Sequence, residues 1–351
     1  MNKLLIVGTV AFDEIETPFG QTDAILGGAA TYIALAASQF KVDSAIVSVV
    51  GEDFPQEHLD LLANKGVDLS ALEIVKGGKT FFWKGKYHND LNSRDTLATD
   101  LNVLADFNPI VPENYKKADV VMLGNLHPSV QMSVINQLEE KPKLIVLDTM
   151  NFWMDNALND LLEVIKHIDV ITINDEEARQ LTGEYSLVTA AEKIHTMGPK
   201  YVVIKKGEHG ALLFHNGSIF FAPALPLKEV FDPTGAGDTF AGGFAGYLAA
   251  TDNITFENGN VQINLVNSIF AEQASTLDAL SMMPGIITDP VSQTISLIAS
   301  GSPLLYIGNR NISMDEFLAI PITNIDVIEI IHNPSAKYEA SGRSVILITL
   351  L

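Results

Sequence analysis

The chain of 351 residues contains no cysteine, which excludes disulfide bonds, thiolate metal ligands and a thiol nucleophile. Its eight histidines are scattered and form no H-x-x-x-H pair, so nothing in the sequence indicates a zinc site. No apolar run is long enough to span a bilayer. The N-terminal residues also lack the small-residue cleavage site of a signal peptide. We therefore expect a cytoplasmic protein with no membrane partner.

Cations are scarce as well. The sequence has 22 Lys and Arg against 43 Asp and Glu, a formal net charge of −21. This balance argues against a nucleic-acid partner, because such binding depends on cations that meet phosphates. A small anionic ligand is still compatible with an acidic chain, since backbone amides and one local cation can hold it. The usual nucleotide motifs are missing, however: "GGKT" (77–80) has Glu73 where a P-loop needs its first glycine, and no G-x-G-x-x-G follows the first apolar run.

Short β-branched runs recur along the first part of the chain and predict the fold. The runs are 3–10, 44–51, 118–126, 143–150, 168–174 and 200–207. They are continuously apolar rather than alternating, which is typical of strands buried on both faces of a parallel sheet. Helical patterns lie between them at 29–40, 127–140, 156–168 and 175–183. Strands that alternate with helices predict a three-layer αβα domain with a mostly parallel central sheet.

Two polar stretches interrupt this rhythm, and the end of the chain departs from it. Residues 13–26 and 79–99 are partly alternating, as in exposed antiparallel strands with one covered face, and we interpret them as a small β-lid. Residues 261–280 can form a helix pair that packs on the core. From residue 252 onward there are only three cations against ten acids. We expect one domain over residues 1–290 and a C-terminal segment of uncertain fold over 291–351.

The stretch "FDPTGAGDTFAGGF" (231–244) carries the most informative pattern. Glycines in the turn before a helix leave N–H groups uncovered, and the helix dipole there favours anionic oxygens. Asp238 places a carboxylate beside this anion site. Such a group is useful if it takes a proton from a hydroxyl that attacks a phosphoryl group, although an acid in a first helical turn can also serve as a cap. The three glycines at 242, 243 and 246 predict close packing of another backbone.

"DPTGAGDTFAGGF" resembles the second signature of the ribokinase-like (PfkB) carbohydrate kinase family at essentially every position. The resemblance implies that Asp238 is the catalytic base. It also implies that Gly235, Ala236 and Gly237 form the anion hole for the transferring phosphoryl group.

"LGGAATYIALAAS" (26–38) is similar to the first signature of the same family. By that resemblance the pair Gly27 and Gly28 approaches the substrate, and Asp13 binds acceptor hydroxyls, for which a carboxylate suits because it accepts two hydrogen bonds. A tight turn and a strand exit are the structural alternatives. Tyr32 stands where the family commonly has Asn, so the hydrogen bond that Asn would give a sugar hydroxyl is missing.

Two further segments resemble the nucleotide side of the family. Asn174 and Glu177 match its N-x-x-E element, which implies that they help to hold Mg²⁺ through water, while capping of the following helix is the alternative role for Asn174. "IKKGEHGALLF" (204–214) is similar to the segment beside the nucleotide, with Gly207 and Gly210 at the expected places. Lys205 replaces the usual Thr and can contact a phosphate or ribose, or only solvent.

The resemblance covers about residues 3–255 and implies an ATP-dependent kinase that uses Mg²⁺ and acts on a hydroxyl of a sugar. A nucleoside kinase of the same fold is one alternative, because Tyr32 and the aromatic residues 81–83 can stack on a base. A non-catalytic binding protein that keeps the fold is another, although the complete glycine loop with Asp238 argues against it. The exposed lid strands also allow a homodimer through lid pairing.

Overall fold

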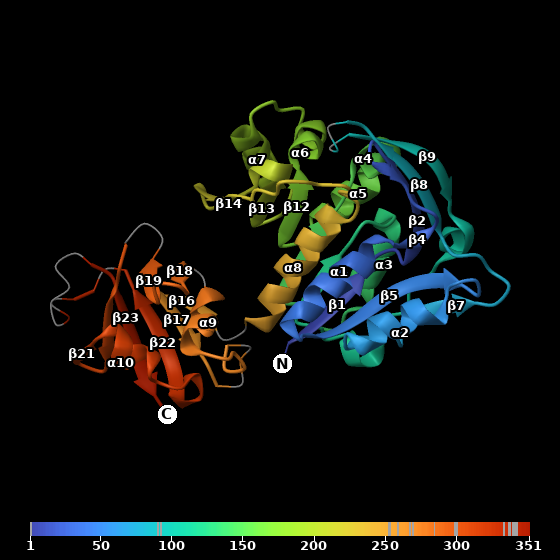
Figure 1. The fold of residues 1–351 in the computed structure, drawn as a ribbon. Helices are drawn as coiled ribbons and strands as arrows, with labels where there is room; N and C mark the ends of the chain where they lie inside the picture. The colour runs from blue at the N-terminus through green and yellow to red at the C-terminus, as the bar shows by residue number, and fades with distance from the viewer. Residues whose placement is uncertain are drawn as a thin grey trace. The chain divides into compact units, whose positions relative to one another are not determined.

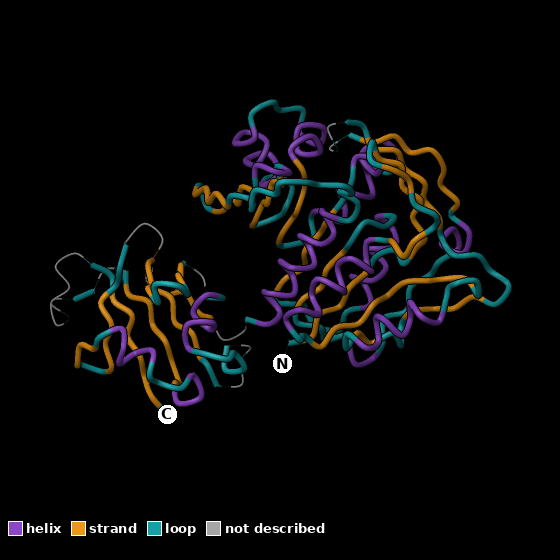
Figure 2. The backbone as a smooth tube through the Cα atoms, in the orientation of Figure 1, coloured by secondary structure: helices purple, strands orange, loops and turns teal. Residues whose placement is uncertain are grey.

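The computed structural model divides the chain into two compact units, Met1–Ala249 and Ala250–Leu351, each treated below by itself (Figures 1 and 2). The structure describes residues 2–89, 91, 93–251, 254–257, 260–266, 268, 270–283, 285–297, 301–332, 334–335, 338 and 343–351. Within these residues, no helix combines the length and the apolarity that a membrane crossing requires.

A ten-stranded sheet forms the centre of the first unit, in the order β15-β14-β13-β12-β11-β10-β1-β5-β6, with β7 also paired to β5. Its strands are β1 (Lys3–Val7), β5 (Asp43–Gly51), β6 (Val67–Asp68), β7 (Leu72–Val75), β10 (Val120–Leu123), β11 (Leu144–Asp148), β12 (Val170–Asn174), β13 (Tyr201–Lys205), β14 (Ala211–His215) and β15 (Ser218–Ala222). All six runs predicted as strands are present and pair in parallel. Only β14 and β15 run antiparallel, at one end of the sheet.

Helices cover both faces of this sheet, which confirms the predicted three-layer α/β fold. Alternate residues of each strand point to opposite faces; Leu5 and Val7 of β1 join one buried cluster with five helices. Those helices are α3 (Pro128–Gln137), α4 (Asn151–Asn156), α5 (Leu158–Ile165), α6 (Asp175–Thr182) and α7 (Leu187–His195). On the opposite face lie α1 (Ala29–Ala37) and α8 (Ala236–Ala250), side by side in Figure 1. The unit also contains α2 (Gln56–Asn64) and short 3-10 turns at Ser38–Phe40, Asn102–Asp106, Glu113–Tyr115 and Gly207–His209.

Glycines of α8 set how closely it packs against α1. A Cβ at Gly242 would lie 2.4 Å from the carbonyl oxygen of Ile33, and one at Gly246 would lie 2.7 Å from the Cα of Ala37. Both distances are too short for any side chain, so these two glycines are needed for the backbone contact that the sequence predicts. The prediction is wrong for Gly243, because a Cβ there would meet no atom within 4 Å.

A separate sheet of five short strands, here called the lid sheet, is built from the two polar stretches. Its order is β3-β2-β8-β9, with β4 paired to β2. The strands are β2 (Ala11–Thr17), β3 (Gly20–Gln21), β4 (Ile25–Gly27), β8 (Phe82–Tyr87) and β9 (Arg94–Asp100). Segments far apart in sequence are thus joined, since β2 and β8 pair in parallel with Asp13 opposite Trp83.

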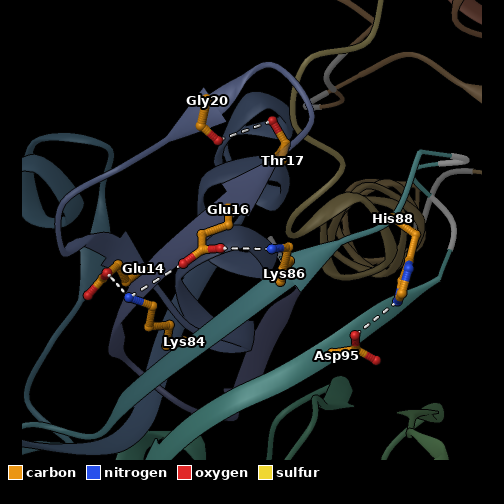
Figure 3. Close-up of polar contacts among 8 residues, drawn as sticks. All are labelled: Glu14, Glu16, Thr17, Gly20, Lys84, Lys86, His88 and Asp95. Atoms are coloured by element: carbon orange, nitrogen blue, oxygen red, sulfur yellow. Dashed lines mark hydrogen bonds and ion pairs between the residues drawn. The ribbon is translucent and has the colours of Figure 1, made fainter.

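One face of the lid sheet carries alternating charges (Figure 3). Lys84 on β8 forms an ion pair with Glu14 on β2, and the Nζ of Lys86 lies 3.5 Å from Oε2 of Glu16. These side chains are partly or largely exposed, so each pair contributes little to stability. The charged side chains keep this face in water. Because side chains alternate along a strand, Asp13 of β2 and Tyr87 of β8 point to the other, buried face.

The second unit is built on a six-stranded sheet in the order β16-β17-β22-β23-β20-β21 and a separate hairpin, β18-β19. Its elements are β16 (Ile254–Glu257), β17 (Asn260–Asn264), α9 (Thr276–Ser281), β18 (Ile286–Asp289), β19 (Thr294–Leu297), β20 (Leu304–Ile307), β21 (Arg310–Ile312), α10 (Met314–Leu318), a 3-10 turn (Ile322–Asn324), β22 (Ile325–Ile331) and β23 (Val345–Leu350). Its core is a cluster of its own that includes Phe270, Phe317 and Ile346.

This unit begins about forty residues before the boundary expected near residue 290. The reason is that β17 pairs with β22, with Ile263 opposite Ile328, and so belongs to the second sheet. The expected helix pair at 261–280 is wrong in its first half. Val261, Ile263 and Leu265 are buried while Gln262 is exposed, and this alternation is the period of a strand.

Candidate active site

Three neighbouring parallel strands end in polar residues at one edge of the central sheet. Asp148, Asn174 and Lys205 are the last residues of β11, β12 and β13. The register places Asn174 directly opposite Lys205. Because the carboxyl ends of parallel strands lie at the same edge, the sequence brings an acid, an amide and a cation together there, at the edge where α/β sheets bind ligands.

Lys205 and Asp148 form a largely buried ion pair. The Nζ of Lys205 lies 2.6 Å from Oδ1 of Asp148, and the side chains are 15% and 7% exposed. Asp148 also accepts a 2.8 Å hydrogen bond from the hydroxyl of Thr172. Burial alone would lower the pKa of Lys205, but the charges of Asp148 and Glu177 outweigh it and raise that pKa. Lys205 is thus held as a cation, and it is not simply solvated.

Asp148 was missed in the sequence. The available signal is its position, as an acid that closes the apolar run "KLIVL" at a strand end. In a strand buried on both faces, a carboxylate at that position must find a partner or a ligand.

Asn174 and Glu177 form a reciprocal cap at the start of α6. The Oδ1 of Asn174 accepts from the amide of Glu177 at 2.8 Å, and Oε2 of Glu177 accepts from the amide of Asn174 at 2.9 Å. The capping role is therefore real, and each side chain keeps further acceptor capacity. Burial raises the pKa of Glu177 to about 7, against the opposing effect of Lys205.

The glycine loop turns sharply into α8. Gly235 has φ 72°, which a residue with a side chain rarely adopts, and a Cβ there would lie 2.6 Å from the ring of Tyr32. The amide of Ala236 donates to the carbonyl of Pro233 at 3.1 Å and closes the turn. The amides of Gly237 and Asp238 follow in the first turn of α8, where a helix leaves its N–H groups without intrahelical acceptors. The amide of Ala236 is thus occupied by Pro233, whereas those of Gly237 and Asp238 lie at the helix start, where a ligand can meet them.

Asp238 lies in this first turn, close to the Lys205 cluster. A Cβ on the preceding Gly237 would lie 3.2 Å from Nζ of Lys205. Loss of hydration raises the pKa of Asp238 to about 7; Asp148 adds to the rise, and Lys205 opposes it. The charge of Arg94, on strand β9 of the lid sheet, also lowers this pKa. Arg94 was missed in the sequence, where nothing distinguishes it from other exposed lid residues.

Asp13 and the glycine pair meet at the inner face of the lid sheet. The amide of Gly28 donates to Oδ2 of Asp13 at 3.4 Å, and a Cβ on Gly27 would lie 2.1 Å from that same oxygen. Gly28 has φ 92°, and a Cβ there would lie 2.4 Å from the carbonyl of Thr9. Burial raises the pKa of Asp13 to about 6. The structure therefore brings Asp13, Gly27 and Gly28 together as the sequence predicts.

Tyr32, on α1, lies close enough to both Asp13 and Asp238 for their charges to act on its hydroxyl. Burial raises the pKa of its hydroxyl, and the charges of Asp13, Asp232 and Asp238 raise it further. The charge of Asp13 in turn raises the pKa of Asp238. The predicted acceptor residues and the predicted base thus belong to one site.

Gly207 and Gly210 lie in the turn between β13 and β14. Their φ values are 54° and 88°, and the amide of Lys206 donates to the carbonyl of Gly210 at 2.8 Å. A Cβ on Gly210 would lie 2.0 Å from the carbonyl of Ala222, the last residue of β15. The contacts of Gly210 are therefore with the sheet end, whereas Lys205, two residues before the turn, faces the carboxylates.

Solved structures with the same fold are ribokinase-like kinases. A nucleoside kinase from Methanocaldococcus jannaschii matches with a TM-score of 0.57 and 21% identity, over 71% of this chain and 85% of its own. An E. coli protein assigned as ribokinase II, solved with ATP and Mg²⁺, matches with a TM-score of 0.60 and 19% identity, over 71% and 85%. These similarities show that the fold is ribokinase-like.

Sequence comparison gives the family. The family model of the pfkB family carbohydrate kinases matches residues 3–258. A cytidine kinase from Thermococcus kodakarensis is 35% identical over 70% of this chain and 89% of its own length. A nucleoside kinase from Methanothermobacter thermautotrophicus is 27% identical over 71% and 84%. The chain belongs to the pfkB family of carbohydrate kinases.

Family membership confirms the predicted kind of enzyme. The protein is a kinase, a phosphotransferase with a hydroxyl acceptor on a sugar or nucleoside. The family model ends at residue 258 and so leaves most of the second unit unmatched. Family membership also does not decide whether the acceptor is a sugar or a nucleoside.

Proposed function

We propose that the protein transfers the γ-phosphoryl group of ATP to a hydroxyl of a nucleoside, with Asp238 as the general base. One observation carries this proposal. At the start of α8, the carboxylate expected to activate the acceptor lies beside helix amides on one side and the Lys205–Asp148 pair on the other. A hydroxyl acceptor and a phosphoryl donor can meet only where such groups converge.

The acceptor would lie against Asp13, Gly27 and Gly28. Asp13 is buried, so its carboxylate has lost hydration. Two substrate hydroxyls that donate to this carboxylate would replace the lost water, and the two hydrogen bonds would orient the substrate. The amide of Gly28 already fixes one oxygen of this carboxylate. The lid sheet, which contributes Asp13, would cover the acceptor and exclude water from the reaction.

Asp238 would accept the proton of the acceptor hydroxyl as that oxygen attacks the γ-phosphorus. The amides of Gly237 and Asp238, at the positive end of the α8 dipole, would stabilise the charge on the transferring group. Lys205 would contact the phosphates from the strand edge, since its ammonium lies close to Gly237. Gly235 allows the sharp turn that aims these amides, and Gly207 and Gly210 shape the turn beside the nucleotide.

Mg²⁺ fits this site through water. Among the residues that the structure describes, no three Asp, Glu, His or Cys side chains gather as direct ligands. Mg²⁺ keeps several waters in such sites and needs few protein ligands. Asn174 and Glu177, with acceptor capacity beyond their mutual cap, would hold these waters, and the ion would neutralise charge on the phosphates.

A nucleoside is favoured over a free sugar as acceptor. The two sequence relatives named above are a cytidine kinase and a nucleoside kinase, and a Burkholderia thailandensis nucleoside kinase of the same fold was solved with inosine. Tyr32 also supplies an aromatic ring that can stack on a base. A residue suited to sugar hydroxyls would instead be polar, like the Asn common at this position in the family.

Acceptor choice is tested by ADP release with matched panels of nucleosides, pentoses, hexoses and sugar phosphates. We expect the highest kcat/KM with a nucleoside. A pentose or hexose that outperforms every nucleoside would replace this proposal with a sugar kinase. Silence across all panels, together with no ATP binding, would indicate a non-catalytic protein.

The pH dependence follows from the pKa of Asp238. Only the ionised carboxylate accepts a proton, and its pKa is raised to about 7, chiefly by burial. Lowering the pH through this value protonates the base, so kcat/KM should fall on the acid side of about pH 7 and level off above it. Initial rates at subsaturating acceptor between about pH 5 and 9 measure this profile. A kcat/KM that stays constant from about pH 5 to 7 would contradict the assignment.

A further inference from the structure

Two side-chain contacts join the lid sheet to the segment that leads into α8. The hydroxyl of Thr234 donates to the hydroxyl of Tyr87, the last residue of β8, at 3.2 Å. At the tip of the β2–β3 hairpin, the ring of Phe19 meets the ring of Phe231 edge to face, with centroids 5.5 Å apart. The lid sheet therefore contacts the loop that supplies the phosphate-binding amides.

Tyr87 is well placed to fix that loop. The residue is 7% exposed, and its hydroxyl accepts the hydrogen bond from Thr234. Thr234 is also held through its backbone, because its amide donates to Oδ1 of Asp232 at 2.9 Å. Fixing Thr234 fixes the start of the turn at Gly235.

Tyr32, on helix α1, contacts the same turn. Its ring occupies the space that a side chain on Gly235 would need. Thr234 and Gly235 thus contact one tyrosine from α1 and one from the lid sheet. Of these two, only the Tyr87 contact depends on the position of the lid sheet.

The lid sheet also carries the acceptor residue. Asp13 lies on β2, and β2 pairs directly with β8, with Asp13 opposite Trp83. A substrate that binds Asp13 therefore contacts a strand that is paired directly with the one that ends at Tyr87. We propose that Tyr87 is a positioning residue that couples acceptor binding at the lid sheet to the geometry of the phosphate loop, through its hydrogen bond with Thr234. This inference rests on the proposed function.

The kinetic test compares Tyr87→Phe, Thr234→Val and the double variant. Each single variant removes one hydroxyl of the pair, and the loss of one hydrogen bond corresponds to about a 2- to 10-fold lower kcat/KM for ATP. The double variant should lose no more than the larger single effect, because both remove the same interaction. The proposed coupling predicts that saturating acceptor increases the ATP affinity of the wild type; this increase should disappear in all three variants, and Thr234→Ser should retain it.

Tyr115→Phe is the matched control, because Tyr115 is a buried tyrosine whose hydroxyl donates to Asp43, away from the site. We expect it to lower thermal stability and to leave the acceptor effect on ATP binding unchanged. Single effects that add in the double variant, or an acceptor effect that survives in Tyr87→Phe, would overturn the inference.

Amide hydrogen exchange gives a readout that needs no activity. In the ligand-free protein, Tyr87→Phe should speed exchange in the segment 233–238, and Thr234→Val should speed it in 82–87. Unchanged exchange in both segments overturns the inference. If these changes occur but the wild type phosphorylates no acceptor, the link between lid and loop stands and the proposed function is wrong.

Discussion

Asp238→Asn is expected to lower kcat by at least about a hundredfold, the usual scale for loss of a general base. The amide keeps the shape of the carboxylate and its place in the first turn of α8, but it cannot take the proton of the acceptor. Binding of ATP should change far less, because Gly237, Lys205 and the helix amides remain. Steady-state ADP release at saturating substrates, with ATP affinity measured separately, gives both values.

A matched variant separates this effect from the loss of an acid at a helix start. Asp160 is an exposed acid in the first turn of α5, outside the residues assigned to the site. Asp160→Asn should leave kcat within about twofold of the wild type, because surface changes of this kind alter energies little. Near-normal turnover by Asp238→Asn would exclude it as the base and leave a capping role.

Lys205→Met is expected to have the second large effect, on both folding and ATP use. The ion pair with Asp148 is largely buried, and removal of one partner leaves an uncompensated charge, a change that costs about 3–5 kcal/mol. Glu177 and Asp238 lose the same cation. The KM for ATP should also rise by about tenfold or more, the scale of a hydrogen bond to a charged group.

Urea unfolding near pH 8 measures the stability loss of Lys205→Met. The deficit should shrink as the pH falls through about 7, because Glu177 and Asp238, whose pKa values are raised to about 7, then bind protons and no longer need the cation. The double variant Lys205→Met/Asp148→Leu should recover most of the lost stability, and Lys206→Met, at the neighbouring position, should lose little. A single variant as stable as the wild type near pH 8 would show that the pair is not a buried charge cluster.

The first unit was largely predictable from sequence. Its parallel strands are continuous apolar runs, a pattern typical of a sheet covered on both faces, and the helices between them carry their own start and stop signals. Asn174 begins α6 with a reciprocal cap, and Gly183 ends it in the left-handed region. These elements depend on local chemistry, so the sequence contains what is needed to place them.

The second unit was not predictable to the same degree. Its sheet is completed by pairs of strands that lie far apart in sequence, as between β17 and β22 and between β20 and β23. Such pairing depends on partners that no local pattern identifies. The alternation at Val261, Ile263 and Leu265 is present in the sequence, but three positions are too short a pattern to distinguish a strand from the start of a helix.

The candidate site was predictable where it coincides with a motif. Asp13, the pair Gly27 and Gly28, and the loop 235–238 all come together in the structure. Asp148, Arg94 and the Tyr87–Thr234 contact were missed. Each of these depends on which strand or lid residue meets the glycine loop in space, and single residues of common types give no signal of that.

The most direct test of the account is the product formed from ATP and a nucleoside. Wild-type protein with MgATP and cytidine, or the best nucleoside of the panel, should yield the nucleoside monophosphate and ADP in equal amounts, and Asp238→Asn should yield almost none under the same conditions. Mass spectrometry of the acceptor with chromatographic quantitation of ADP measures both. ADP that forms without a phosphorylated nucleoside, or equal yields from both proteins, would contradict it.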